Sequence, residues 1–285
     1  MRSIGNFESY QNCFSVSLDQ SSTTPKKGGG KREEIKGLSK GSRRRLVHLI
    51  NSFGPVNQAF FVTLTMREAS EDFKEWKKWL NRTLTAMRYM FPKLSGIWRL
   101  EFQKRGTPHF HLLLFTQELT DIKVLRAKIK SYWRSAVGNK NSSSFHSCKV
   151  EQVRDVKKSG FYLAIYQAKN EQDRTDIPTG KTYGIINKKD LPIARYEGGE
   201  FEDLYFNVWA KRIYRRYIIA NGASKNSPLL FNLRTRTSGF RGFLSRQSQK
   251  KLFSLVADLT NQKIKSIDDF SFTTNRRNSR ELCKL

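Results

Sequence analysis

The stretch SGIWRLEFQKRGTPHFHLLLF, residues 95–115, constrains the fold of this chain more than any other. It contains two runs of aromatic and aliphatic residues separated by Lys-Arg-Gly, and such runs are typical of strands. Gly106 stands where a three-residue hairpin loop needs a left-handed residue, so we expect two antiparallel strands joined by a tight turn. The same loop sets a register in which Glu101 lies directly opposite His109.

Three polar side chains meet on one face of this predicted hairpin. His109 and His111 are two residues apart, so both imidazoles point to the same side of a strand. The Glu101 carboxylate joins them because residues opposite each other on paired strands share a face. Two nitrogens and a carboxylate can hold a divalent cation with positions left open for a phosphate and water. The set lacks the cysteine typical of structural zinc, so a catalytic ion is the better expectation.

The flanking segments alternate between strand and helix patterns. Residues 59–66 have the composition of a buried strand. Apolar residues then recur every three or four positions over residues 70–91 and again over 118–138, which is typical of amphipathic helices. Further strand patterns occur at residues 145–153 and 182–187. Together they predict an α+β fold, with a central antiparallel sheet of about five strands and helices packed on one face.

A second polar constellation lies in YLAIYQAK, residues 162–169. On a helix, Tyr162, Tyr166 and Lys169 fall on one face because they occupy positions i, i+4 and i+7. A free tyrosine has a pKa near 10, so only about one in a thousand is a nucleophilic phenolate at neutral pH. A neighbouring ammonium and a metal that polarises a phosphate both reduce that handicap. Alone, the pattern also fits two half-buried core tyrosines and a lysine whose stem lies along apolar surface.

The balance of charge indicates a polyanionic partner. Lysine and arginine outnumber aspartate and glutamate by 53 to 25, a formal net charge of +28. Nucleic acid is the first partner that such an excess indicates, ahead of an anionic membrane surface. The longest apolar runs fall far short of the roughly 18 residues that a membrane-spanning helix needs. We therefore expect a DNA-binding protein of the cytoplasm with no membrane partner.

The basic residues are concentrated toward the C-terminus. From Leu204 to Ala257 the chain has eleven lysines and arginines and no aspartate or glutamate. A helix is expected over residues 200–220, where aromatic and aliphatic residues recur at steps of four from Tyr205. Four basic residues lie off that stripe and are candidate contacts to DNA phosphates: Lys211, Arg212, Arg215 and Arg216. A solvated basic surface without a partner is the alternative interpretation.

Composition predicts three regions along the chain. Residues 21–31, SSTTPKKGGGK, contain no apolar side chain and cannot offset their chain entropy by burial. We therefore expect residues 1–44 to form a flexible basic N-terminal arm. Residues 45–222 are expected to form one nicking domain that ends in the basic helix. Residues 223–285 remain as a basic tail.

At these motifs the sequence resembles a known family. PHFH resembles the His-hydrophobic-His motif, and YLAIYQAK the Tyr-x-x-x-Tyr-x-x-Lys motif, of two-tyrosine HUH-type rolling-circle replication initiators. That family includes plasmid Rep proteins and the gene A proteins of small single-stranded DNA phages. FVTLT, residues 61–65, is similar to its first motif, and Glu101 stands where many members keep a third metal ligand. The resemblance covers about residues 55–200, with the motifs in the expected order and spacing.

The resemblance implies a concrete activity. HUH enzymes have an RRM/ferredoxin-like core and nick one strand of origin DNA with Mg²⁺ or Mn²⁺, which here would be held by Glu101, His109 and His111. A tyrosine attacks a phosphodiester, becomes linked to the 5′ phosphate and leaves a 3′-OH that primes synthesis. The implied partners are single-stranded and duplex origin DNA together with a host helicase and polymerase. The expected setting is a microbial cell that carries the plasmid or phage.

Two other functions remain open at this point. The same catalytic residues serve HUH transposases, which act on single-stranded ends of mobile elements, and a silent origin-binding repressor would need only the basic surface. An ATPase is a poor fit, because in TDIPTGKT Thr175 stands where a Walker A loop needs its first glycine. Within the tyrosine motif, Lys169 is one turn from Tyr166 but two from Tyr162, so we expect Tyr166 to attack first.

Overall fold

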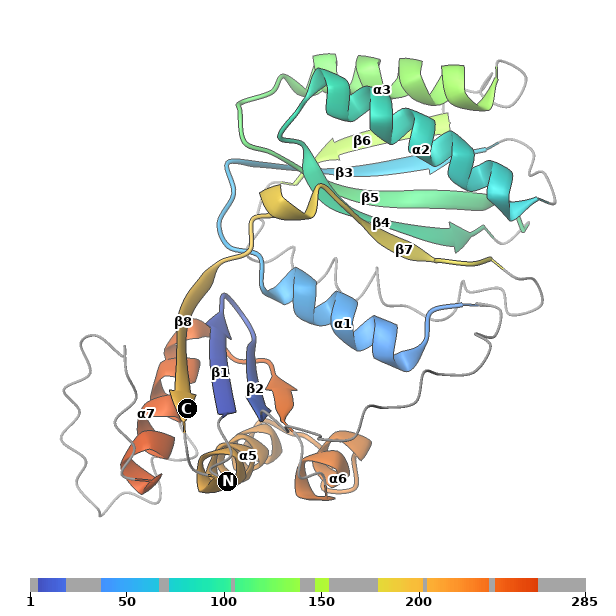
Figure 1. The fold of residues 1–285 in the computed structure, drawn as a ribbon. Helices are drawn as coiled ribbons and strands as arrows, with labels where there is room; N and C mark the ends of the chain where they lie inside the picture. Colours follow the sequence, from blue (N-terminus) through green and yellow to red (C-terminus); the bar gives the residue numbers. More distant parts are fainter. Residues whose placement is uncertain are drawn as a thin grey trace, which may run out of the picture. The chain divides into compact units, whose positions relative to one another are not determined.

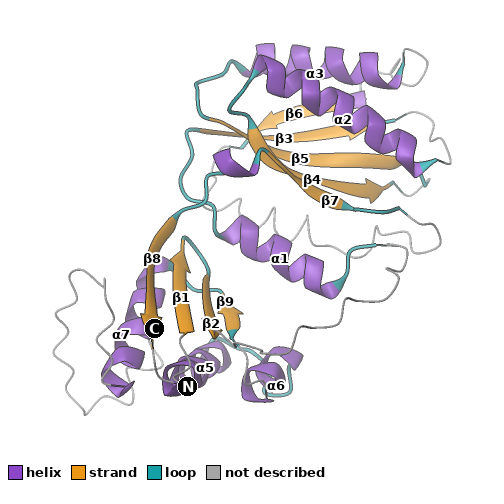
Figure 2. Ribbon diagram, in the orientation of Figure 1, coloured by secondary structure: helices purple, strands orange, loops and turns teal. Residues whose placement is uncertain are grey.

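The computed structural model describes residues 5–18, 37–66, 72–103, 106–138, 147–153, 179–201, 204–235 and 239–260. The chain divides into two compact units, each with its own sheet and helices (Figures 1 and 2). One unit is Gly29–Pro192. The other combines Met1–Gly28 with Ile193–Leu285.

The unit Gly29–Pro192 is built on a five-stranded sheet in the order β6-β3-β5-β4-β7, and every neighbouring pair is antiparallel. The strands are β3 (Gln58–Thr65), β4 (Ser95–Phe102), β5 (Pro108–Thr116), β6 (Cys148–Gln152) and β7 (Tyr183–Ile186). A 3₁₀ turn, η2 (Lys188–Asp190), follows β7. The expected α+β architecture with about five antiparallel strands is confirmed.

Two amphipathic helices, α2 (Phe73–Met90) and α3 (Ile122–Val137), cover one face of this sheet (Figure 1). Each begins at an aspartate that accepts a hydrogen bond from a backbone N–H two residues on, which satisfies one of the free donors of the first turn. Trp133 of α3 is fully buried against Phe110 of β5, and its indole nitrogen donates to the Thr65 carbonyl at 3.0 Å. Both helices match the segments predicted from apolar periodicity.

The opposite face of the sheet is divided into an apolar and a polar half. Helix α1 (Lys40–Asn51) packs Leu46 and Ile50 against Leu113 and Phe115. The expectation that all helices lie on one face was therefore wrong, because β5 is apolar on both sides at this end and needs cover on both. Farther along β5 the same face carries the two histidines.

The second unit has a four-stranded antiparallel sheet in the order β8-β1-β2-β9. Its strands are β1 (Gly5–Tyr10), β2 (Phe14–Leu18), β8 (Arg195–Phe201) and β9 (Phe240–Gly242), and its helices are α5 (Leu204–Ala220), α6 (Pro228–Thr235) and α7 (Arg246–Thr260). Its core is largely aromatic. Phe7 lies between Phe206 and Phe253, with ring centroids 5.9 and 4.6 Å away.

The predicted N-terminal arm is therefore wrong for residues 5–18. Phe7, Phe14 and Val16 are buried, and the Ser9 hydroxyl donates to Gln249 of α7. The strands were missed because β1 and β2 are short and pair with β8 and β9 from the far end of the chain. The low-complexity stretch 21–31, on which that prediction depended, lies outside the described residues.

The boundaries at residues 222 and 223 also differ from the structure. Helix α5 belongs with β1 and β2 in the second unit, and α6, β9 and α7 within the predicted basic tail complete the same core. No helix among the described ranges is long and apolar enough to cross a membrane.

Candidate metal centre

The β4–β5 hairpin has the register that its loop predicts. Glu101 pairs with His109, and Arg99 with His111. Gly106 has a φ of 83°, the left-handed conformation expected at the end of the loop. Because side chains alternate along a strand, this register places all four polar side chains on the face opposite α2 and α3.

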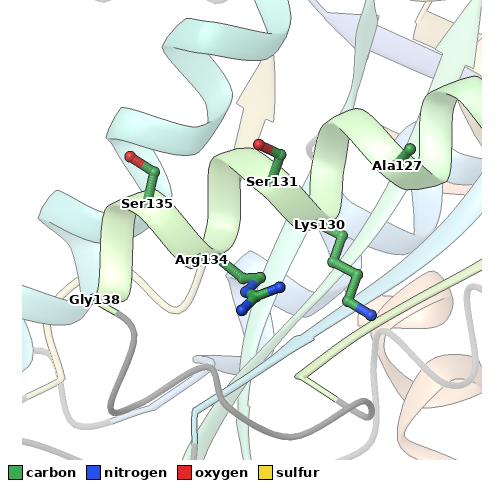
Figure 3. Close-up of a pocket in the computed structure, with 6 residues that line it drawn as sticks. All are labelled: Ala127, Lys130, Ser131, Arg134, Ser135 and Gly138. Atoms are coloured by element: carbon green, nitrogen blue, oxygen red, sulfur yellow. The ribbon is translucent and has the colours of Figure 1, made fainter.

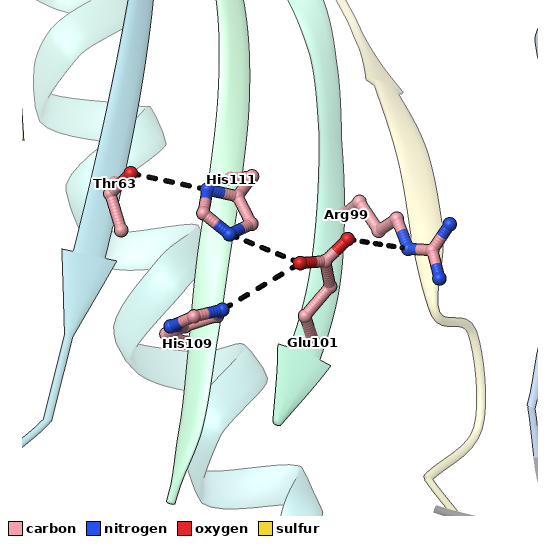
Figure 4. Close-up of polar contacts among 5 residues, drawn as sticks. All are labelled: Thr63, Arg99, Glu101, His109 and His111. Atoms are coloured by element: carbon pink, nitrogen blue, oxygen red, sulfur yellow. Dashed lines mark hydrogen bonds and ion pairs between the residues drawn. The ribbon is translucent and has the colours of Figure 1, made fainter. Parts of the chain in front are cut away.

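Glu101, His109 and His111 converge at the polar end of this face (Figure 4). The Oε2 atom of Glu101 lies 3.1 Å from Nε2 of His111 and 3.7 Å from Nε2 of His109. One ligand atom from each residue lies within 4.8 Å of the others. The convergence expected from the sequence is confirmed as geometry.

The donor set fits a divalent cation. Glu101 is 3% exposed, and both imidazoles are partly buried. Nε2 of His109 is buried and has no hydrogen-bond partner among the residues that the structure describes. Leaving such an atom without a partner costs about 1–3 kcal/mol, and an ion between the three side chains would satisfy it. One carboxylate oxygen and two imidazole nitrogens suit Mn²⁺ and related cations and leave coordination positions for substrate.

The electrostatics keep Glu101 in its ligating form. Burial by itself raises the pKa of the carboxyl group. Contacts with His109 and His111, together with the charges of His111 and Arg99, outweigh burial and lower the pKa to about 2. The carboxylate is therefore ionised throughout the physiological pH range.

Two residues beside the three candidate ligands were not predicted from the sequence. The guanidinium of Arg99 lies on one side, with Nε 3.2 Å from Oε1 of Glu101. The hydroxyl of Thr63, on β3, lies on the other side, 3.1 Å from Nδ1 of His111. A signal for both was present, since Arg99 is two residues before Glu101 and Thr63 belongs to the FVTLT motif of the neighbouring strand.

The tyrosine motif lies outside the described residues. Tyr162, Tyr166 and Lys169 all fall between residues 154 and 178, which the structure does not describe. Their roles therefore stay predictions from sequence.

The basic residues of α5 do not share one environment. Arg212 and Arg216 are exposed and Arg215 is half-buried, as phosphate contacts require. Lys211 is only 6% exposed, and burial lowers the pKa of its ammonium group. Its proposed contact with a DNA phosphate does not fit this position.

The reason lies in how α5 packs. Phe206 stacks on Phe201 with ring centroids 4.3 Å apart, whereas Tyr205 is 66% exposed. The buried stripe is therefore centred on Phe206, Ala210 and Tyr214 rather than on the stripe that starts at Tyr205. Periodicity alone could not separate these adjacent stripes, because both carry aromatic residues.

An open hollow of about 710 Å³ lies along α3 and is lined by Ala127, Lys130, Ser131, Arg134, Ser135 and Gly138 (Figure 3). The serines point away from Lys130 and Arg134. Since α3 covers the face of the sheet opposite the histidines, this hollow is separate from the candidate metal centre.

Comparisons with known proteins connect this region to DNA replication. Residues 59–171 match the family model of replication-associated protein ORF2. That range contains the three candidate ligands and the tyrosine motif. The match lies wholly inside the unit Gly29–Pro192.

Two phage proteins are similar to this chain. Over 139 residues it is 26% identical to the replication-associated protein of Pseudomonas phage Pf3, covering 48% of this chain and 49% of that protein. Over 185 residues it is 28% identical to the replication protein of Haemophilus phage HP1, covering 59% of this chain and 22% of that protein. The chain thus spans about half of the first relative and about a fifth of the second.

Among solved structures, the hypothetical protein ORF119 from Sulfolobus islandicus rod-shaped virus 1 aligns with 45% of this chain and 96% of its own length. The sequence identity is 14% and the TM-score 0.28. So low a score supports no argument about shared fold.

Proposed function

We propose that this chain initiates rolling-circle replication of a phage or plasmid by nicking and rejoining single-stranded origin DNA. One observation carries the proposal. Glu101, His109 and His111 converge, with a buried and unsatisfied imidazole nitrogen, inside the range that matches replication-associated proteins. The two phage replication proteins similar to this chain support the same role.

Each residue then has a defined role. Glu101, His109 and His111 would hold Mg²⁺ or Mn²⁺, which when bound polarises the phosphate under attack. Lys169 favours the phenolate form of Tyr166, the first nucleophile. Tyr162 serves the second, terminating transfer.

The strand transfer balances without an external energy source. The Tyr166 oxygen forms a bond to phosphorus, the bond from phosphorus to the 3′ oxygen breaks, and that oxygen takes up a proton as the 3′-OH. The aryl phosphodiester keeps the energy of the bond that was cut. A 3′-OH can therefore attack it and rejoin a strand without ATP. Strand separation and synthesis would come from a host helicase and polymerase.

Covalent capture tests this function. The full chain is incubated with single-stranded fragments of its own replicon and Mn²⁺, denatured in SDS, and any attached DNA is sequenced. We expect an adduct that survives SDS, maps to one site and disappears when EDTA replaces Mn²⁺. Binding without an adduct under these conditions would instead support the catalytically silent repressor.

The exposed arginines of α5 should contribute to DNA affinity. Replacing Arg212, Arg215 and Arg216 together with glutamine should lower the slope of log K against log salt by up to about 3, because each lost phosphate contact removes about 0.9. Binding to duplex and single-stranded DNA over a series of salt concentrations measures this slope.

A matched variant controls for net charge. Lys74, Lys78 and Arg82 are exposed on α2, and replacing them with glutamine removes the same number of charges from the other unit. We expect a smaller change in slope in that variant. Equal slopes in the α5 variant and the unmodified chain would show that α5 does not contact DNA.

A further inference from the structure

Arg99 is a fully buried cation beside the candidate metal centre. Its exposed fraction is 0%, and arginine is almost never buried to that extent unless it is paired. It lies two residues before Glu101 on β4 and directly opposite His111 on β5 (Figure 4). A positive charge next to a cation site works against cation binding by simple repulsion. Its position therefore needs another explanation.

The geometry of Glu101 provides one. Oε1 faces Arg99, with Nε at 3.2 Å, whereas Oε2 faces both imidazoles. The two carboxylate oxygens thus have different neighbours. Rotating the carboxylate would separate Oε1 from a guanidinium that has no access to water. Arg99 therefore holds the carboxylate with Oε2 toward the histidines.

Thr63 orients the other side of the site in the same way. Its hydroxyl lies 3.1 Å from Nδ1 of His111, and the ring of Phe61 stacks on that imidazole at 5.3 Å with an interplanar angle of 18°. When Nδ1–H donates to the hydroxyl, Nε2 is the nitrogen left to ligate a metal. That same Nε2 points at Oε2 of Glu101.

We propose that Arg99 and Thr63 are positioning residues that select the ligand atoms of the metal centre. Arg99 occupies Oε1, so that Glu101 offers only Oε2 to a divalent cation, and Thr63 leaves Nε2 of His111 facing the ion. The inference rests on the proposed function, because it presupposes that Glu101, His109 and His111 bind an ion. It assigns to Arg99 an orienting role that outweighs its repulsion of the cation.

Mn²⁺ binding to the full chain without DNA tests the inference, measured by titration calorimetry or by loss of the free-ion EPR signal. Arg99→Lys keeps the charge but replaces the planar fork by a point charge, so a change in affinity reports geometry. Arg99→Gln removes the charge as well. We expect both to bind Mn²⁺ about 10–100-fold more weakly than the unmodified chain, the usual effect of losing a contact to a metal ligand. Unchanged or tighter binding would overturn the role of Arg99.

Thr63 has its own pair of variants. Thr63→Val keeps the shape but removes the hydroxyl, and should weaken Mn²⁺ binding about tenfold. Thr63→Ser restores the hydroxyl and should restore affinity. The matched control is Thr83→Val, since Thr83 is also fully buried but donates to the Trp79 carbonyl within α2. Equal affinity in Thr63→Val and the unmodified chain would overturn the role of Thr63.

Circular dichroism and ion-free thermal unfolding establish that each variant is folded. Should Arg99→Gln fail to fold, Arg99→Lys decides for that residue. His109→Ala separates the two levels of inference. If the unmodified chain shows no Mn²⁺ site that His109→Ala removes, the proposed function fails. If it shows one and the variants of Arg99 and Thr63 bind Mn²⁺ equally well, only the positioning inference fails.

Discussion

Replacing either His109 or His111 with alanine should reduce DNA cleavage by at least about 100-fold, the scale on which loss of a preorganised electrostatic group slows an enzyme. Each change leaves two of the three candidate ligands, too few to hold the ion firmly beside the phosphate. Binding to duplex origin DNA should remain nearly unchanged, because it depends on contacts between exposed cations and phosphates. The loss should therefore appear in the rate of cleavage rather than in affinity.

Nicking of a labelled single-stranded origin fragment in Mn²⁺, with filter binding on duplex DNA in parallel, measures both quantities. His48→Ala is the matched control, since His48 lies in the same unit on α1, away from the three candidate ligands. We expect it to cleave like the unmodified chain. Near-normal cleavage by both His109→Ala and His111→Ala, with EDTA-treated protein, would refute the metal role.

The candidate metal centre was predictable because its determinants are local. A three-residue loop ending in Gly106 sets the register of one hairpin, and the period of two along each strand then decides which side chains share a face. No residue distant in sequence is needed to bring Glu101 to His109. The positions of Thr63 and Arg99 require one further step, the pairing of β3 and the burial of β4.

The second unit could not be predicted in the same way. Ser9 and Gln249 are 240 positions apart, yet they are hydrogen-bonded in one core. Short strands such as β1 carry too few residues for a periodic pattern to identify them. The face that α5 buries is likewise set by distant partners, since Phe206 packs against Phe7 and Phe253 from opposite ends of the chain.

The order of attack by Tyr166 and Tyr162 rests on helical spacing in the sequence alone, and it should produce different failures in two variants. Tyr166→Phe should lose most initial nicking of a substrate with one origin, because its phenolate is the one that Lys169 stabilises one turn away. Tyr162→Phe should still nick but fail to release closed circles from a substrate with two origins.

Mass spectrometry of the trapped adduct identifies the tyrosine used in the first turnover. We expect the phosphotyrosine on Tyr166 in the unmodified chain, and near-normal nicking in the control Tyr89→Phe, which removes a phenol that is 91% exposed on α2. An adduct mainly on Tyr162 would reverse the assignment. An equal mixture would mean that Lys169 does not distinguish the two phenols and that they alternate from the start, as two nucleophiles on one helical face can when each is within reach of the same phosphate.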